Sequence, residues 1–256
     1  MFILLFMENI YRLKIANIEL DYSFFIPETY YYFKDFIISK DQQFFDLRTT
    51  KNDMEKWSYL VLPEESADFL EYRLMILKLS DYLCRRRACV IHSCAVMWKG
   101  LAWLFVGPSG IGKTTMYHNW KSLLGSEVEI LNGDMPIVAE TQDGSIRIYP
   151  SPWNGKENYG TLSDVPLGGL LFLEQGEENC IRRAELSEIV AALYAHFMCI
   201  SDSKEIVRCL SKLEESILLS TPVWIFTNRG DLDSAAVSTI VISKYLKEKG
   251  NDILQI

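Results

Sequence analysis

The chain has 256 residues, of which 49% are hydrophobic and 23% are charged. This composition is typical of a soluble globular protein and excludes a disordered chain and a coiled coil. The 34 acidic residues outnumber the 26 basic ones, which leaves a formal net charge of −8. Because that charge offers no general attraction to a phosphate backbone, we expect no nucleic-acid partner.

The cysteines and the first residues indicate the compartment. The six cysteines contain no C-x-x-C pair and are too sparse for a disulfide scaffold, so we expect buried, reduced thiols in a cytoplasmic protein. The opening MFILLFM is too short to cross a bilayer and lacks the basic start and the cleavage site of a signal peptide, so we expect no membrane partner. An ordinary strand pattern begins at Met7, which leaves Met1 and Met7 as alternative native starts.

Residues 1–62 predict a small β-rich N-terminal unit. The alternation that begins at Ile10, the aromatic cluster Tyr30 to Phe33 and the run QQFFDL are typical of short strands. We expect the aromatic cluster to serve the core or a docking contact rather than a ligand platform. Apolar residues at helical spacing then predict a connecting helix over residues 63–87.

Residues 88–256 predict a mixed sheet with flanking helices. The runs ACVIHSCAVM and LAWLFVG, separated by Lys99-Gly100, predict a hairpin. The runs MPIVAE and SIRIY turn on Asp143-Gly144 and predict a second hairpin, where a repeating βαβ chain would have a helix. GGLLFL and CIRRAEL predict a further strand pair about EQGEEN, and TPVWIFTNR predicts a buried strand.

Three helices complete the second half of the chain. We expect Ser187 to cap EIVAALYAHFMCI, SKEIVRCLSKLEESILL to form an amphipathic helix, and Asp231 to cap LDSAAVSTIVISKYLKEK. The expected fold class is therefore α/β, with a larger domain of mixed, partly antiparallel sheet and flanking helices after a small β-rich domain.

A Walker-type motif lies between the strand LAWLFV and the helix that follows. Its members are Gly107, Pro108, Ser109, Gly110, Ile111, Gly112, Lys113 and Thr114, and they satisfy G-x-x-x-x-G-K-[ST] in full. The glycines let the backbone wrap a phosphate closely, so that loop amides point at its oxygens. We expect the motif and Thr115 to bind ATP, with Lys113 at the β and γ phosphates and the Thr114 hydroxyl on Mg²⁺. The alternative is a glycine-rich turn without a ligand.

Asp134 and His92 are the candidate catalytic partners of the loop. Asp134 ends the predicted strand EVEIL, where an acid can hold the metal or accept a proton, although N-G-D is also turn chemistry in its own right. The hairpin places His92 opposite Val106 with a three-residue turn and opposite Gly107 with a two-residue turn. At either position the imidazole could bond a phosphate oxygen or modulate Asp134, and a core histidine is the alternative.

The remaining candidate residues have less specific chemical roles. The loop PSPWNGKENYG contains Trp153, Gly155 and Lys156, and Lys156 could offer a second cation to the transferred phosphate or be an ordinary surface lysine. We expect this loop to border the acceptor or the phosphate. His118 and His196 lie in predicted helices with no evident partner and are expected to be structural.

Six blocks taken together resemble the HPr kinase/phosphorylase-like proteins: IHSCAV, LFVGPSGIGKTT, LNGD, YPSPWNGKE, PLGGLLFLEQGEEN and TPVWIFTNRGDLDSAA. The resemblance implies a phosphate-loop domain with the fold of phosphoenolpyruvate (PEP) carboxykinase, and a small stand-alone kinase. It also implies that Lys113 and Thr114 hold ATP and Mg²⁺, that Asp134 activates an acceptor hydroxyl, and that His92 lies beside it. Two features depart from the family: Gly133 stands where an adjacent second acid is often found, and the glycine- and arginine-rich segment is missing.

These observations predict an ATP-dependent, Mg²⁺-assisted phosphotransferase. Its acceptor would be a serine-like hydroxyl of a protein, a peptide or a small molecule, and a homo-oligomer is compatible with the resemblance. The alternative is an ATP-binding regulatory or maturation partner that transfers no phosphate, which the single acid and the missing segment favour. A transporter ATPase is disfavoured because the chain contains no LSGGQ-like signature.

Overall fold

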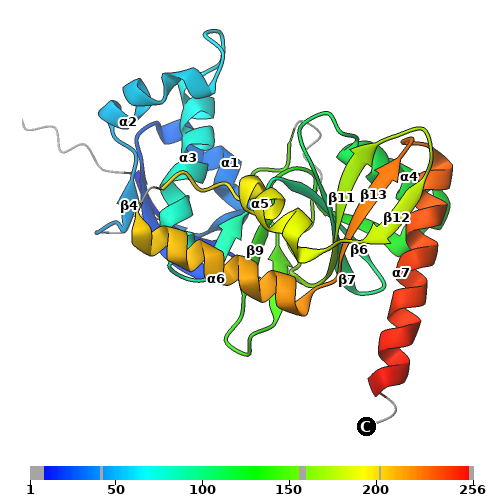
Figure 1. The fold of residues 1–256 in the computed structure, drawn as a ribbon. Coiled ribbons are helices and arrows are strands. Elements are labelled where there is room, and N and C mark those ends of the chain that lie inside the picture. The colour runs from blue at the N-terminus through cyan, green and yellow to red at the C-terminus, as the bar shows by residue number, and fades with distance from the viewer. Residues whose placement is uncertain (1–8, 41–42, 156–159, 202, 254–256) are drawn as a thin grey trace, which may run out of the picture. The chain divides into compact units, whose positions relative to one another are not determined.

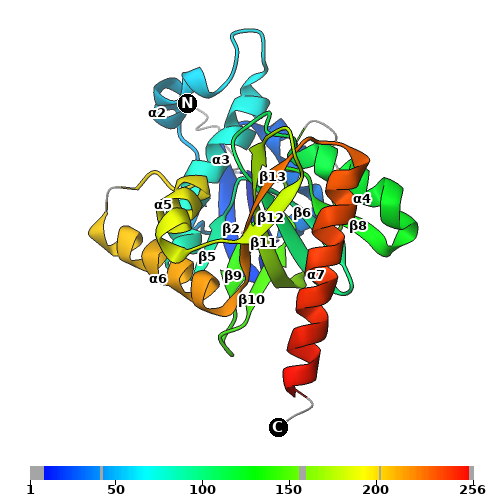
Figure 2. The same ribbon diagram turned by 45° about the vertical axis from the view of Figure 1, so that its right-hand side comes forward.

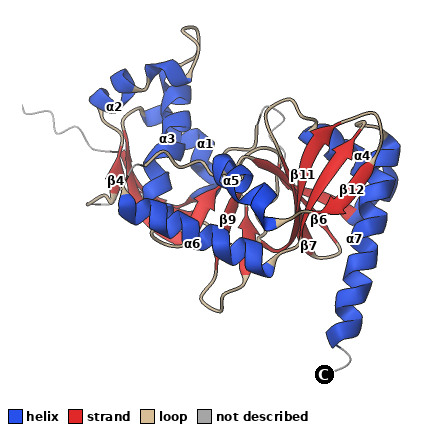
Figure 3. Cartoon of the chain, viewed as in Figure 1, coloured by secondary structure: helices blue, strands red, loops and turns tan. Residues whose placement is uncertain are grey.

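The computed structural model describes residues 9–40, 43–155, 160–201 and 203–253 of the chain (Figure 1). The chain forms two compact units, and both combine strands with helices (Figure 3). The first unit comprises Met1–Val90 and Met198–Leu210, and the second comprises Ile91–Phe197 and Ser211–Ile256. The segment 198–210 thus packs with the first unit, although it lies within the stretch 88–256 that the sequence analysis treats as one domain.

The first unit has a four-stranded sheet in the order β3-β1-β2-β4. Its strands are β1 (Asn9–Ile15), β2 (Ile18–Phe24), β3 (Ile37–Lys40) and β4 (Leu47–Arg48), a further strand is β5 (Ala88–Val90), and its helices are α1 (Tyr30–Phe33), α2 (Lys51–Lys56) and α3 (Ala67–Cys84). The predicted helix over 63–87 is therefore shorter at both ends. The side chains of Leu74 and Leu79 on α3 are fully buried.

The aromatic residues of the first unit differ from the prediction. Tyr30 to Phe33 form α1 rather than a strand, because one helical turn buries Phe33 while it leaves Tyr31 61% exposed. Four consecutive aromatic residues lack the alternation that a half-buried strand requires. Of the described residues in the run QQFFDL, only Leu47 enters a strand, and Phe44 is 80% exposed.

Glu71 is the buried acid of the first unit. Its carboxylate accepts hydrogen bonds from the backbone N–H groups of Phe25 (2.8 Å) and Ile26 (2.7 Å) and from the hydroxyl of Thr29 (2.8 Å). Burial raises the pKa of Glu71, and these hydrogen bonds oppose the rise. The side chain therefore ties α3 to the segment that follows β2.

Replacing Glu71 by Ala should lower the free energy of unfolding by about 2–4 kcal/mol, because two backbone N–H groups and the buried hydroxyl of Thr29 would lose their acceptor. Urea denaturation measures the change. Glu64→Ala, which alters an exposed acid, is the control and should change stability by less than about 0.5 kcal/mol. Equal effects of the two substitutions would contradict the assigned role of Glu71.

The second unit also consists of strands and helices. The strands are β6 (Ser93–Trp98), β7 (Leu101–Val106), β8 (Val128–Asn132), β9 (Ile137–Glu140), β10 (Ile146–Tyr149), β11 (Val165–Gln175), β12 (Cys180–Arg183) and β13 (Val223–Asn228). The helices are α4 (Lys113–Leu124), α5 (Leu186–His196) and α7 (Leu232–Ile253), and the boundary between the units falls within α6 (Lys204–Ser220).

The sheet of the second unit confirms the mixed topology. Its strands follow the order β9-β10-β11-β7-β6-β8, with β13 paired to β11 and β12 paired to β13. Both predicted hairpins are confirmed: β6 and β7 pair with Trp98 opposite Leu101, which makes a two-residue turn, and β9 pairs antiparallel with β10. Strands β7, β11 and β13 are mutually parallel, so their carboxyl ends lie at one edge of the sheet.

The predicted pairing of GGLLFL with CIRRAEL is wrong. Strand β13 lies between them: it pairs parallel with β11 and antiparallel with β12. Local spacing favours a hairpin between neighbouring segments. The apolar strand β13 is buried, since Trp224 and Phe226 are at most 2% exposed. It therefore lies in the interior of the sheet, and β12 pairs with its outer side.

Helices cover both faces of this sheet. Helices α4 and α7 lie side by side in Figures 1 and 2, and the indole N–H of Trp120 on α4 donates to the hydroxyl of Ser238 on α7 (2.9 Å). They pack over a core that includes Trp103 and Trp224. On the other face, the ring of Phe172 on β11 meets His196 at the end of α5 edge to face.

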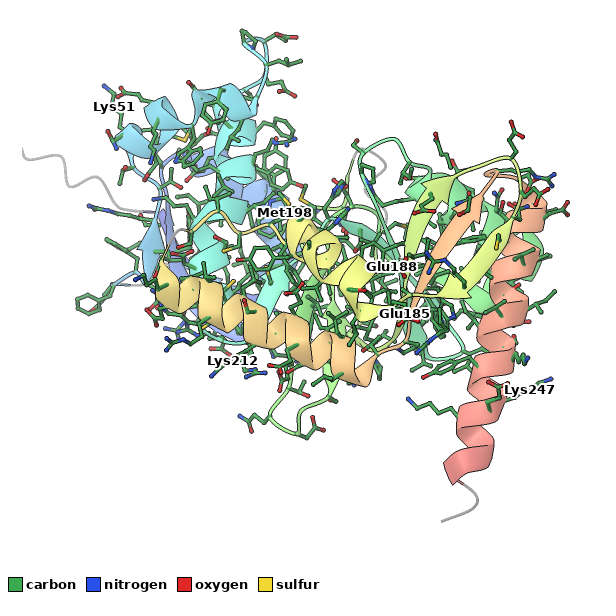
Figure 4. The ribbon with its side chains drawn as sticks, in the orientation of Figure 1. Lys51, Glu185, Glu188, Met198, Lys212 and Lys247 are labelled. Carbon is green, nitrogen blue, oxygen red and sulfur yellow. The ribbon has the colours of Figure 1, made fainter. Side chains whose placement is uncertain are left out.

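Of the two predicted helix caps, Asp231 is confirmed and Ser187 is wrong. Asp231 caps α7 as predicted, because its carboxylate accepts from the N–H of Ser234 (3.0 Å). Ser187 is not the cap of α5, which begins at Leu186 after Glu185. The carboxylate of Glu188 accepts from the N–H of Glu185 (2.9 Å), and both residues are labelled in Figure 4. This bond is the Glu188 half of a capping box, in which the side chain of the third helical residue accepts from the N–H of the cap residue.

The cysteines correct one further expectation. Cys84, Cys89 and Cys94 are buried, but Cys180 is exposed and Cys199 and Cys209 are partly exposed, so the thiols are not all buried. All six are free. No helix within the described part of the chain combines the length and the apolar character that a membrane span requires.

Candidate functional site

The Walker-type loop connects β7 to α4 in the second unit. Gly110 and Gly112 have φ angles of 81° and 107°, which residues with L side chains rarely adopt, so the path of the loop requires glycine at both positions. Helix α4 begins at Lys113, directly after Gly112. Pro108, Ser109 and Gly110 are exposed, so this part of the loop is open to a ligand. The strand, loop and helix thus follow in the order that phosphate binding needs.

Lys113 is held at the inner side of the loop. Its ammonium group donates to the carbonyl oxygens of Gly107 (2.9 Å) and Pro108 (3.1 Å) and lies 3.2 Å from Nε2 of His92. The residue is 8% exposed. Burial lowers the pKa of Lys113, and the charge of Asp134 opposes the shift. A cation is therefore kept among neutral acceptors, beside the position that the β and γ phosphates take in a Walker-type loop.

His92 directly precedes β6, Asp134 follows the end of β8, and the two residues meet beside Lys113. The N–H of Ser93 donates to the carbonyl of Asp134 (2.9 Å), which brings the two segments together. Nε2 of His92 lies 3.5 Å from Oδ1 of Asp134, and the side chains are 24% and 35% exposed. The two-residue hairpin turn extends the register so that His92 falls opposite Gly107, the second of the two predicted positions.

The role of His92 follows from the hydrogen-bond chemistry. Burial, and then the charge of Lys113, lower the pKa of His92 against the opposing charge of Asp134, so the ring is neutral near pH 7. Lys113 can only donate, which makes Nε2 of His92 an acceptor for it. The same nitrogen then has no proton to give to Asp134. His92 thus orients the lysine and leaves the carboxylate of Asp134 free to accept a proton.

Asn132 is the residue that sequence reasoning missed. It is fully buried, and its Oδ1 accepts from the N–H groups of Asp134 (2.9 Å) and Met135 (2.8 Å). Its Nδ2 donates to Oδ1 of Asn154 (2.6 Å) and to Oγ of Ser151 (3.1 Å). An Asn two residues before the acid in an N-G-D turn is the signal that could have revealed it.

Asn132→Ala should reduce both stability and activity, because two backbone N–H groups beside Asp134 would lose their acceptor. We expect a loss of about 2–3 kcal/mol in the free energy of unfolding, measured by urea denaturation, and a lower rate of phosphate transfer. Glu129→Ala, at an exposed position of the same strand, is the control and should leave both unchanged. A stable variant with normal activity would show that Asn132 does not position Asp134.

The packing at Gly133 explains why Asp134 has no second acid directly before it. A Cβ atom at this position would lie 2.8 Å from the carbonyl oxygen of Asn154, closer than real Cβ atoms approach. A second carboxylate beside Asp134 would therefore require the loop at Asn154 to move.

The residues present fit Mg²⁺ bound together with a nucleotide. Among the described residues, no group of three or more His, Cys, Asp or Glu side chains could hold a metal ion. Mg²⁺ in nucleotide sites needs no such group, since it uses one or two protein oxygens, phosphate oxygens and waters. Thr114, in the first turn of α4, and Asp134 have side-chain oxygens of that kind and are the residues that would hold the ion.

The loop after β10 passes Asp134 but differs from its expected character. Trp153 is 2% exposed, so its ring belongs to the core and offers no surface to an acceptor. A Cβ at Gly155 would lie 3.2 Å from Cβ of Asp134, so the loop runs directly beside the acid. Lys156 lies outside the described residues.

His196, expected to be structural, lies next to the site. Its carbonyl accepts from the N–H of His92 (2.8 Å), and the two rings stack with centroids 6.1 Å apart. Nδ1 of His196 lies 2.8 Å from the carbonyl of Ala192 on its own helix. His196 therefore supports the position of His92 from the end of α5.

Comparisons with known proteins leave the family open. No family model and no curated protein matches the chain. Among solved structures, the Hpr(Ser) kinase/phosphatase from Coxiella burnetii is similar over 65% of this chain and 96% of that one, with 12% identity and a TM-score of 0.39. A likeness at this level supports no argument about activity, so the proposal below depends on the residues of this chain alone.

Proposed function

We propose that the chain is an ATP-dependent, Mg²⁺-assisted phosphotransferase. It would move the γ-phosphate of ATP to a serine-like hydroxyl of a protein, a peptide or a small molecule. The observation that supports this most directly is the meeting of Lys113, His92 and Asp134 at the end of a complete Walker-type motif. The proposal includes a PEP carboxykinase-like fold for the second unit and a cytoplasmic location.

The loop residues would bind and neutralise the triphosphate. Phosphate oxygens would replace the carbonyl oxygens of Gly107 and Pro108 as partners of the Lys113 ammonium group, and loop amides would donate to them. Thr114 and Asp134 would hold Mg²⁺. When bound, that ion supplies positive charge to the terminal phosphates and a template for their orientation.

Asp134 would act on the acceptor. Its carboxylate takes the hydroxyl proton as the acceptor oxygen forms a bond to the γ-phosphorus and the bond from that phosphorus to the β,γ-bridging oxygen breaks, which releases ADP. Because the lone pair of Nε2 on His92 accepts from Lys113, that nitrogen does not compete for this proton. Positioning and electrostatic stabilisation would supply most of the rate enhancement.

A second candidate is an ATP-binding regulatory or maturation partner that transfers no phosphate. The packing of Gly133 against Asn154 favours it, since it leaves one carboxylate where metal binding and proton transfer would otherwise use two.

The test is transfer of labelled γ-phosphate from ATP with Mg²⁺ to a panel of acceptors. The panel contains free serine, serine-containing peptides and an HPr-like protein, and the expected result is label in one acceptor class that disappears when Mg²⁺ is chelated. Tight ATP binding without a labelled product across the panel would favour the second candidate. Absence of ATP binding would overturn both.

A further inference from the structure

A cleft of about 330 Å³ borders the Walker-type loop in the second unit. We call it the β13 cleft. It is lined by Gly110, Ile111 and Gly112 of the loop, Thr115 in the first turn of α4, Gln175 at the end of β11, Gly176 after it, and the segment Asn228–Gly230. Lys113, His92 and Asp134 do not line it. We propose that the β13 cleft holds the nucleoside half of the nucleotide whose phosphates the loop binds, with Arg229 against the base. This inference rests on the proposed function.

The position of the cleft follows from the topology. The strands β7, β11 and β13 are parallel, with Val106 paired to Phe172 and Gln175 paired to Asn228. The segments that follow these strands therefore meet at one edge of the sheet. Two of them, after β11 and β13, form the wall of the cleft opposite the loop (Figure 2 shows these strands beside α4 and α7).

The direction of a bound nucleotide agrees with this position. In a Walker-type loop the lysine faces the β and γ phosphates, so the nucleoside, attached at the α-phosphate, extends away from the lysine. Lys113 points toward His92 and Asp134. The β13 cleft contacts the loop at Gly112 and Thr115 but contains none of these three residues. It is thus where the other end of the nucleotide would lie.

The size and the walls suit a nucleoside. The volume is at the lower end of the roughly 300–1,000 Å³ range of small-molecule sites, enough for one nucleoside. Backbone forms much of the wall: a Cβ at Gly176 would lie 2.4 Å from Cγ2 of Thr227, and Gly230 has a φ of 74°. Neither position accepts a side chain without strain.

Arg229 supplies a planar cation in a fixed position. Its Nη2 lies 2.6 Å from Oδ2 of Asp231 and 3.3 Å from Oδ2 of Asp233, while its side chain remains 45% exposed. Its own N–H donates to Oδ1 of Asn179 (2.9 Å), which anchors the backbone as well. A guanidinium group held in this way can stack on the face of a base.

The hydrogen bonds around the cleft indicate low discrimination between purines. The side chain of Asn228 is committed to the carbonyls of Glu174 and Phe226 and to the N–H of Gly230. Oδ1 of Asp231 is committed to its own helix cap, and the described residues that line the cleft include no Asp or Glu, so no carboxylate of the lining selects guanine. Gln175 has both a donor and an acceptor and can pair with either purine. We expect ATP and GTP to bind within about tenfold of each other.

The experiment compares ATP, GTP and tripolyphosphate, each titrated by calorimetry into the full chain with Mg²⁺. Gln175→Trp fills the cleft from an exposed position, and Glu177→Trp places the same side chain in the same turn outside it. A second pair is Arg229→Ala and, as its control, Arg182→Ala, which removes an exposed arginine paired with Glu188 (2.7 Å).

We expect Gln175→Trp to weaken ATP binding at least tenfold and Arg229→Ala to weaken it about three- to tenfold. Binding of tripolyphosphate should change less than twofold in either variant, and both controls should behave as the wild type. Wild-type protein that binds ATP no more tightly than tripolyphosphate, or cleft variants that bind ATP normally, would overturn the β13 cleft but leave the proposed function standing. Wild-type protein that binds neither ligand would overturn both.

Discussion

Asp134→Asn should lower kcat for phosphate transfer by about 10²- to 10⁴-fold, the usual contribution of a general base. The amide matches the carboxylate in size, and the backbone N–H of Asp134 keeps its bond to Oδ1 of Asn132, so the fold should not change. What is lost is the group that accepts the hydroxyl proton. Single-turnover transfer from labelled ATP measures the effect separately from product release.

The Mg²⁺ requirement of the Asp134→Asn variant distinguishes a general base from a metal ligand. If Asp134 acts only as the base, the variant should need the same Mg²⁺ concentration as the wild type. If it also holds the metal, the Mg²⁺ requirement should rise while kcat falls. Asp143→Asn, in the exposed turn between β9 and β10, is the control and should transfer phosphate normally. An Asp134→Asn protein as fast as the wild type would remove the proposed base.

Lys113→Met should weaken ATP binding by roughly 10- to 100-fold, which corresponds to the loss of about 1.5–3 kcal/mol of charged hydrogen bonds. Transfer should decrease further, because charge on the terminal phosphates is greatest in the transition state. Methionine retains the length of the buried stem of a residue that is 8% exposed, so the loop can keep its path. Titration with ATP and with tripolyphosphate should show weaker binding of both ligands.

Lys121→Met is the matched control for this prediction. Lys121 lies on the same helix, and its ammonium group also donates to a backbone carbonyl, that of Val128 (2.7 Å). Its loss should leave ATP binding unchanged. Equal weakening by the two substitutions would point to damage to α4 rather than to a phosphate contact of Lys113.

The loop and the hairpins could be predicted from the sequence because their causes are local. Gly110 and Gly112 mark a backbone path that only glycine adopts easily, and Lys99-Gly100 sets the register of β6 and β7. That register alone placed His92 near the loop. The cap at Asp231 is predictable for the same reason, since the carboxylate bonds an N–H three residues on.

The rest depends on pairing between segments far apart in the chain. Only the sheet shows that β13 lies between β11 and β12, because an apolar run in the sequence does not indicate which other strand it pairs with. This insertion places Arg229 beside Gln175 and creates the β13 cleft.

Asn132 and Gly133 illustrate the same division at the site. The sequence by itself determined that a Walker-type motif is present and that an acid follows a strand, because each is a short pattern with its own backbone chemistry. The tertiary structure decided how they meet: a buried amide holds Asp134, and Asn154 leaves Gly133 no room for a second acid. Close packing between distant segments sets these contacts, and the order of residues along one segment does not contain that information.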